Sequence, residues 1–257
     1  MNIKTEEVIL RSAKVRCPDG KSQTVCDIFS YQPDNIEQMP LGNLYIVAEL
    51  SDIKDCGHLN NLLASLIKRE YYLHPSKGAF PSLQSALSKA NLHLKDSANQ
   101  GNLEWLGKFH FICAAINEDG LFLTQAGNSK AFLCRQNHLA NLSRKIIPES
   151  EKPHPSKIFS SIVSGKVEPA DKIILATPVV DELFSPAGLR QVLISQPTLS
   201  SISDQINKTL REQNKRLQIA ILLLQAEADE IFEQHPCQSP ETPKAITPPI
   251  DLSEILR

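Results

Sequence analysis

Four side chains that could bind a metal ion lie close together between positions 52 and 58. Carboxylates and an imidazole together suit several divalent cations, so a metal site is one interpretation of this cluster. The same stretch carries Lys54 and has no framing motif, and an amphipathic pattern begins at Leu59. These features favour the other interpretation, a solvated loop before a helix. The four residues are Asp52, Asp55, Cys56 and His58.

Short catalytic motifs give no further candidate. Gly20, Lys21 and Ser22 resemble the end of a phosphate-binding loop, but Val15 stands where that loop needs a glycine. Without this glycine the backbone amides cannot wrap a phosphate, so we exclude such a site. The chain also contains no GxSxG nucleophile elbow, no HExxH and no GxGxxG.

Two segments in the second half of the chain carry a family resemblance. In the first, Gly127-Asn128-Ser129 precedes a strand pattern, and in the second, Thr177 follows an apolar strand pattern with Glu182 soon after it. They resemble the metal-dependent, PPM-type protein serine/threonine phosphatases, which have a G-D-S turn and later a T-D-G-L-x-D segment at the corresponding places. The two segments read LFLTQAGNSKAFLCRQNHLANLSRK and FSSIVSGKVEPADKIILATPVVDELFS.

The rest of the chain matches this family more loosely. Cys26-Asp27 stands where the family has N-E-D, and Glu49-Leu50 stands where it has D-G. Lys215 takes the place of an aspartate before the last strand. The resemblance covers about residues 10–225. It implies a four-layer α-β-β-α sandwich, in which two packed antiparallel sheets are flanked by helices.

In this family, acidic residues bind two Mg²⁺ or Mn²⁺ ions, which activate a water molecule and neutralise phosphate charge. Here Cys26 offers a soft sulfur, Pro178 offers no side-chain ligand, and Lys215 places a positive charge where cations would bind. The resemblance therefore implies no catalytic residues and no cofactor, although an active enzyme would need Mg²⁺ or Mn²⁺. The vestigial metal-site positions are Cys26, Asp27, Glu49, Leu50, Pro178 and Lys215.

Two carboxylates remain at these vestigial positions. Asp27 and Glu49 could together hold one residual divalent ion. The alternative, which we favour, is that they are carboxylates at the rim of a sheet with no ion.

The apolar periodicity independently predicts an α+β fold. Helical spacing extends over 59–67, 83–94 and 199–210, and Ser185-Pro186 has the form of a helix start. Short β-branched or aromatic runs predict strands, and Asn117 to Gly120 predicts a hairpin turn between two of them. Helices, then a meander of strands, then helices and a last strand suit antiparallel sheets covered by helices. The predicted strands are 44–47, 109–116, 121–125, 131–134, 172–175 and 217–224.

Length and composition set the class of protein. The 257 residues carry a net charge of −2, which removes the electrostatic drive toward nucleic acid or an acidic membrane. Widely spaced cysteines and the lack of a signal pattern predict a cytoplasmic protein with free thiols. We expect one domain over 1–225, a frayed helical extension from Ala226 to about His235, and disorder in the rest of the acidic, then proline-rich segment 226–257.

Three hypotheses about function follow. The first is a catalytically inactive phosphatase-like module that binds a protein partner, a phosphoprotein among the candidates, through the old cleft or the C-terminal segment. The second is an active phosphatase with a rebuilt metal centre, using Asp27, Glu49, Glu182 and Asp52 or Asp55. The third is an unrelated α+β interaction protein. Two face-packed antiparallel sheets with outer helices would favour the first two hypotheses over the third.

Overall fold

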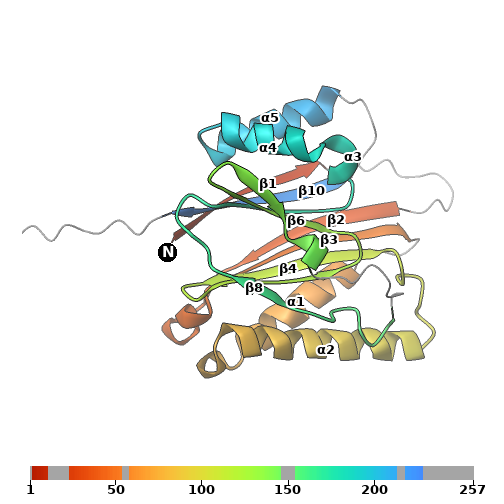
Figure 1. The fold of residues 1–257 in the computed structure, drawn as a ribbon. Helices are drawn as coiled ribbons and strands as arrows, with labels where there is room; N and C mark the ends of the chain where they lie inside the picture. Colours follow the sequence, from red (N-terminus) through yellow and green to blue (C-terminus); the bar gives the residue numbers. More distant parts are fainter. Residues whose placement is uncertain (1, 11–22, 54–57, 146–153, 213–217, 228–257) are drawn as a thin grey trace, which may run out of the picture.

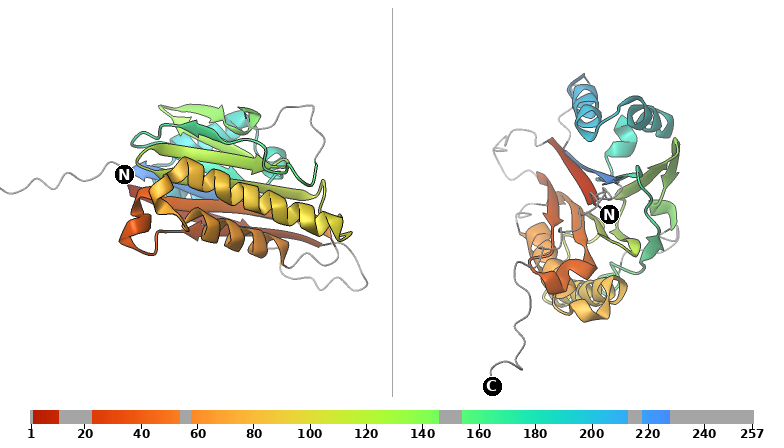
Figure 2. Two further views of the ribbon diagram at one scale, coloured as in Figure 1. Left: turned by 90° about the horizontal axis from the view of Figure 1, so that it is seen from below. Right: turned by 90° about the vertical axis from the view of Figure 1, so that its left-hand side faces the viewer.

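The computed structural model describes residues 2–10, 23–53, 58–145, 154–212 and 218–227, and these form four layers (Figure 1). Two five-stranded antiparallel sheets pack face to face, and helices cover both outer faces (Figures 1 and 2). The first sheet has the strand order β1-β10-β9-β6-β7, and the second has the order β2-β3-β4-β5-β8. The predicted α+β sandwich is therefore confirmed.

The first sheet is built from strands distant in sequence. It consists of β1 (Asn2–Leu10), β10 (Ile219–Glu227), β9 (Lys172–Ala176), β6 (Lys130–Arg135) and β7 (His138–Asn141). Its outer face is covered by α3 (Val180–Leu183), α4 (Pro186–Ser195) and α5 (Leu199–Glu212).

The second sheet follows chain order more closely. It consists of β2 (Gln23–Tyr31), β3 (Asn43–Ile53), β4 (Phe109–Asn117), β5 (Gly120–Ala126) and β8 (Val163–Gly165). Its outer face is covered by α1 (Leu59–Tyr71) and α2 (Ala79–Asn99). Short 3₁₀ helices lie at η1 (Ile36–Leu41), η2 (Pro75–Lys77) and η3 (Ser143–Lys145).

Alternation along the strands creates three hydrophobic layers. In β3, Tyr45 and Val47 point between the sheets, whereas Leu44 and Ile46 point toward α1 and α2. All four side chains are buried, because a strand in the middle of a covered sheet has no face exposed to water. The sheets are thus held by apolar contacts on both faces, which leaves room for polar groups mainly at the strand ends.

Both predicted turn signals are present. Ser185 caps α4 by accepting a hydrogen bond from the Gly188 N–H at 3.1 Å, with Pro186 at the first helical position. Asn117 and Gly120 face each other across the β4–β5 hairpin. The helical spacings correctly predict α1, α2 and α5.

The sequence-based prediction is wrong at one point and incomplete at others. Ala226 does not begin a helical extension, because it pairs with Ile3 in the β10–β1 ladder. The strands β1, β2, β7 and β8 are additional to the predicted set. Residues beyond Glu227, including the rest of that expected extension and of the C-terminal segment, lie outside the described residues.

One end of the sandwich, called here the rim, brings several strand ends together. Leu50 near the end of β3 pairs with Phe109 at the start of β4, and Lys130 at the start of β6 pairs with Ala176 at the end of β9. Residues 127–129 connect the end of β5 in one sheet to the start of β6 in the other. None of the described helices is both long and apolar enough to span a membrane.

Candidate functional site

A row of polar side chains crosses three neighbouring strands at the rim, on the face between the sheets. Cys26 of β2 pairs with Glu49 of β3, and Glu49 pairs with His110 of β4. Cys26 belongs to the hydrophobic layer between the sheets, and alternation from Val47 and Ile112 places Glu49 and His110 on the same face. Of the predicted positions, the structure therefore brings Cys26 and Glu49 together.

Glu49 is buried, with 4% of its surface exposed. Its carboxylate accepts a hydrogen bond from Ser51 Oγ at 2.6 Å and lies 3.8 Å from the Cys26 Sγ donor. Burial raises the pKa of the Cys26 thiol strongly, and the negative charge of Glu49 raises it further. Cys26 is therefore a neutral thiol that donates to the carboxylate and not a reactive nucleophile, and its soft sulfur is a poor ligand for Mg²⁺ or Mn²⁺.

His110 connects this row to the turn at 127–129. Its Nδ1 accepts a hydrogen bond from the Asn128 N–H at 3.1 Å, which places the imidazole proton on Nε2. Burial lowers the pKa of His110, and the nearby Glu49 charge only partly opposes this effect. The imidazole is therefore neutral at pH 7 and serves as an acceptor that positions the turn.

The turn itself explains the Gly-Asn-Ser motif. Gly127 has φ +65°, and a Cβ there would collide with His110 Nδ1 and the Phe109 carbonyl oxygen. Asn128 is exposed, whereas Ser129 is fully buried and its Oγ has no hydrogen-bond partner among the described residues. Glycine is thus required twice, by the backbone conformation and by the close approach to β4.

The second motif lies at the end of β9, on the other sheet. The buried Thr177 hydroxyl accepts a hydrogen bond from the Ala220 N–H at 3.3 Å, and the Thr177 N–H donates to the Ala220 carbonyl at 3.0 Å. Pro178 provides only a carbonyl, which accepts from the Asp181 N–H at 3.2 Å. Glu182 is exposed on α3. This motif therefore anchors a strand end and starts α3, without offering an inward carboxylate.

An ion pair joins the two motifs. Lys130 Nζ, next to the Gly-Asn-Ser turn, lies 2.7 Å from the Asp181 carboxylate of α3. Both side chains are partly exposed, so the pair contributes little to stability. It shows, however, that segments well separated in sequence meet at one rim.

Two predicted site residues lie on the other side of the second sheet. The Asp27 carboxylate accepts a hydrogen bond from Asn60 Nδ2 of α1 at 3.0 Å, and Leu50 is buried in the layer beneath α1 and α2. Asp27 and Glu49 therefore lie on opposite faces of the sheet, and the structure does not bring them together. Lys215 lies outside the described residues, as do Asp55 and Cys56.

These donors do not fit a two-ion centre. Within the described residues, no group of three or more His, Cys, Asp or Glu side chains could hold a metal ion. The row at the rim consists of the buried Glu49 carboxylate, a neutral thiol and a neutral imidazole, whereas a pair of Mg²⁺ or Mn²⁺ ions requires several negatively charged oxygens. We therefore derive no reaction step through metal ions.

Sequence reasoning missed three participants in this site: His110, Ser51 and Lys130. The sequence does not mark His110 as a site residue, because it lies near the start of an apolar strand pattern. Only the register between β3 and β4 places it beside Glu49. Ser51 follows Glu49 by two positions, so the alternation of a strand could have indicated that both side chains share a face.

Comparisons with solved structures reveal the same architecture in bacterial phosphatases. A serine/threonine phosphatase from S. agalactiae is 13% identical, covering 88% of this chain and 100% of its own, with a TM-score of 0.59. The chain has the fold of the PPM-type phosphatases. Mycobacterium tuberculosis PstP is 14% identical over 88% of this chain and 99% of its own, with a TM-score of 0.57.

The magnesium complex of RsbX also has this PPM-type fold. It is 18% identical over 87% of this chain and 94% of its own, with a TM-score of 0.54. No protein-family model matches the sequence, and the search of curated proteins gives no match. The PPM-type fold is therefore established by structure, while identities this low say nothing about activity.

Proposed function

We propose that this chain is a catalytically inactive PPM-type phosphatase-like domain that acts as a binding or regulatory module for a protein partner. The observation that carries the proposal is the state of Glu49. This carboxylate is buried at the rim and is bound to Ser51 and Cys26. Its oxygens are thus already engaged by two protein donors, whereas a hard cation would take them as ligands together with several further anionic oxygens.

The neighbouring positions support the same conclusion. Pro178 and the neutral Cys26 thiol supply no anionic oxygen, and Asp27 is bound to Asn60 across the sheet. Proteins with a similar fold do bind divalent cations: PstP has been solved with two manganese ions and RsbX with magnesium. Hydrolysis by such ions requires several charged ligands around a shared water, and the described part of this chain contains no cluster of that kind.

Loss of the metal site is compatible with retention of the fold. The core consists of apolar layers that do not depend on the rim residues, and functional polar sites usually cost stability rather than add to it. A rigid sandwich with a polar rim is suited to binding a protein segment. We propose phosphoproteins as the first class of partner to test, in a regulatory or signalling role.

Hydrolysis of an aryl phosphate by the full chain, with and without millimolar Mn²⁺, tests this proposal. A Glu49→Ala, Asp27→Ala double variant removes the two vestigial carboxylates, and Asp96→Ala provides a control at an exposed carboxylate of α2. We expect the rate of all three proteins to equal that of buffer containing Mn²⁺. Turnover that requires Mn²⁺ and is lost only in the double variant would establish a rebuilt metal centre and overturn the proposal.

A further inference from the structure

A hollow of about 700 Å³ lies at the end of the sandwich opposite the rim. It is lined by Ile3 of β1, by residues of η1, by Asn117 at the end of β4 and by Glu118 after it. Two large apolar side chains of η1 stand open to solvent beside it: Ile36 is 84% exposed and Met39 is 65% exposed. Exposed apolar side chains at the edge of a hollow are typical of a docking surface, and methionine adapts to partners of varied shape.

The last described strand, β10, ends beside this hollow. Ile3, which lines it, pairs with Ala226, and β10 ends at Glu227. In Figure 1 the arrow of β10 points to the same end of the sandwich at which β1 starts. Residues 228–249 could span on the order of 70 Å if extended, so the last residues of the chain can reach the hollow from any approach.

Residues 250–257 have the pattern of a short amphipathic helix. Asp251 followed by Glu254 matches a helix-capping box, and Leu252, Ile255 and Leu256 fall on one face at helical spacing. The hollow carries Glu118 and Asp34, of which Asp34 is paired with Lys68 at 3.4 Å, and residues 250–257 carry Asp251 and Glu254 against Arg257. The contact therefore rests on apolar burial rather than on charge. We propose that residues 250–257 dock into the hollow of the same chain, with their apolar face on Ile36 and Met39.

The covalent connection between residues 250–257 and the folded domain strengthens this contact. A peptide of this size buries little apolar surface and binds weakly in trans, but a covalent linker raises its effective concentration into the millimolar range. The contact would cover the exposed side chains of η1 and leave the rim at the other end open. The proposal is independent of whether the rim is catalytically active, and an external partner with a similar apolar segment would compete for the hollow.

A labelled peptide of residues 247–257 tests the proposal in trans. The full chain carrying Leu252→Asp and Leu256→Asp frees the hollow without changing any described residue. We expect the peptide to bind this variant at least tenfold more tightly than the wild type, in which the hollow is already occupied. Adding Ile36→Asp and Met39→Asp should abolish binding, whereas adding Leu92→Asp, a half-exposed leucine of α2, should not.

Any one of four results would overturn the proposal. One is no detectable binding of the peptide to the Leu252→Asp, Leu256→Asp variant. Another is equal affinity for the variant and the wild type, or binding that survives the changes at Ile36 and Met39. The last is a concentration-dependent dimer in analytical ultracentrifugation that Ile36→Asp dissociates, because this would assign the hollow to a second copy of the chain.

Discussion

Gly127 combines a left-handed backbone with a close approach to β4. We predict that Gly127→Ala lowers the free energy of unfolding by more than about 2 kcal/mol, since it adds a steric collision to the backbone penalty of about 1 kcal/mol. Gly101 is a matched control, because it has φ +90° and a Cβ added there would meet no atom within 4 Å. Gly101→Ala should cost only the backbone penalty, and equal losses in urea unfolding would contradict the role of Gly127.

Ala170 is a non-glycine residue in the left-handed backbone region, where glycine would be favoured. It adopts φ +69° in the loop between β8 and β9. We predict that Ala170→Gly stabilises the protein by about 0.5–1 kcal/mol, because relief of the left-handed strain exceeds the entropy cost of glycine. Ala187→Gly in the exposed first turn of α4 should instead destabilise it. A lower unfolding midpoint for Ala170→Gly would contradict this account.

The lowered pKa of His110 predicts that the stability of the fold depends on pH. Its pKa in the folded protein is below the ordinary value of 6.5, so between these two values the unfolded chain binds a proton that the folded chain does not. The free energy of unfolding should therefore fall as the pH drops below about 6.5. His110→Asn retains an acceptor for the Asn128 N–H and should flatten this slope, which urea unfolding at several pH values measures.

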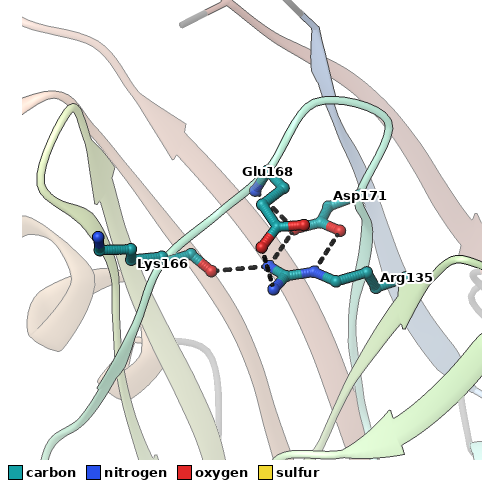
Figure 3. A network of polar contacts seen from close by, with 4 residues as sticks. All are labelled: Arg135, Lys166, Glu168 and Asp171. Carbon is teal, nitrogen blue, oxygen red and sulfur yellow. Dashed lines mark hydrogen bonds and ion pairs between the residues drawn. The ribbon is translucent and has the colours of Figure 1, made fainter.

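At the scale of elements, hydrogen bonds and ion pairs of Arg135 connect β6 to the loop that precedes β9. Its guanidinium binds both oxygens of Asp171, at 2.9 and 2.7 Å, together with the Glu168 carboxylate and the Lys166 carbonyl (Figure 3). Asp171 is 1% exposed and also accepts from the Glu168 N–H. The network therefore holds the loop in a conformation that keeps Ala170 at positive φ.

Removing the Arg135 side chain should strongly lower the free energy of unfolding. Arg135→Ala leaves the buried Asp171 carboxylate without its cation, so we predict a loss of about 3–5 kcal/mol in the free energy of unfolding. Glu168→Ala removes the exposed partner of the same arginine and should cost less than about 1 kcal/mol. Similar losses for the two variants in chemical denaturation would refute a buried, directional role for Asp171.

The elements differ in how far the sequence predicts them. The helices α1, α2 and α5 were predictable because each buries one apolar stripe, and β4 and β10 because both of their faces are covered. The edge strand β1 was not predictable, because its sequence NIKTEEVIL lacks a clear apolar alternation. Its pairing partner, β10, also lies far away in the sequence. The β6–β7 hairpin turns through Gln136 and Asn137, which lack the glycine that usually marks such a turn.

The candidate site was predictable in its residue types but not in its contacts. The family resemblance grouped Cys26 and Glu49 as positions of one site, but their pairing across β2 and β3 was not predicted, because β2 was missing from the predicted strands. Whether Asp27 shared their face depended on that same pairing, and the structure places it against α1 instead. The Glu49 to Ser51 hydrogen bond and the position of His110 depend on side-chain geometry that the pattern does not contain.

At the scale of the whole molecule, the two ends of the sandwich have different chemistry. The rim gathers the phosphatase-like motifs around the buried Glu49 carboxylate, and the far end offers a hollow with exposed apolar side chains beside the start of the C-terminal segment. We propose that the rim of this PPM-type fold has lost its two-ion centre and that the domain binds a partner rather than hydrolysing phosphate.

Binding of Mn²⁺ to the full chain tests this claim most directly. Equilibrium dialysis at millimolar Mn²⁺, with Glu49→Ala as the paired variant, measures how many ions each chain holds and whether the rim holds them. We predict that the wild type and Glu49→Ala bind the same amount, with no saturable pair of sites in either. Two ions bound per wild-type chain, with both lost in a folded Glu49→Ala variant, would contradict the account.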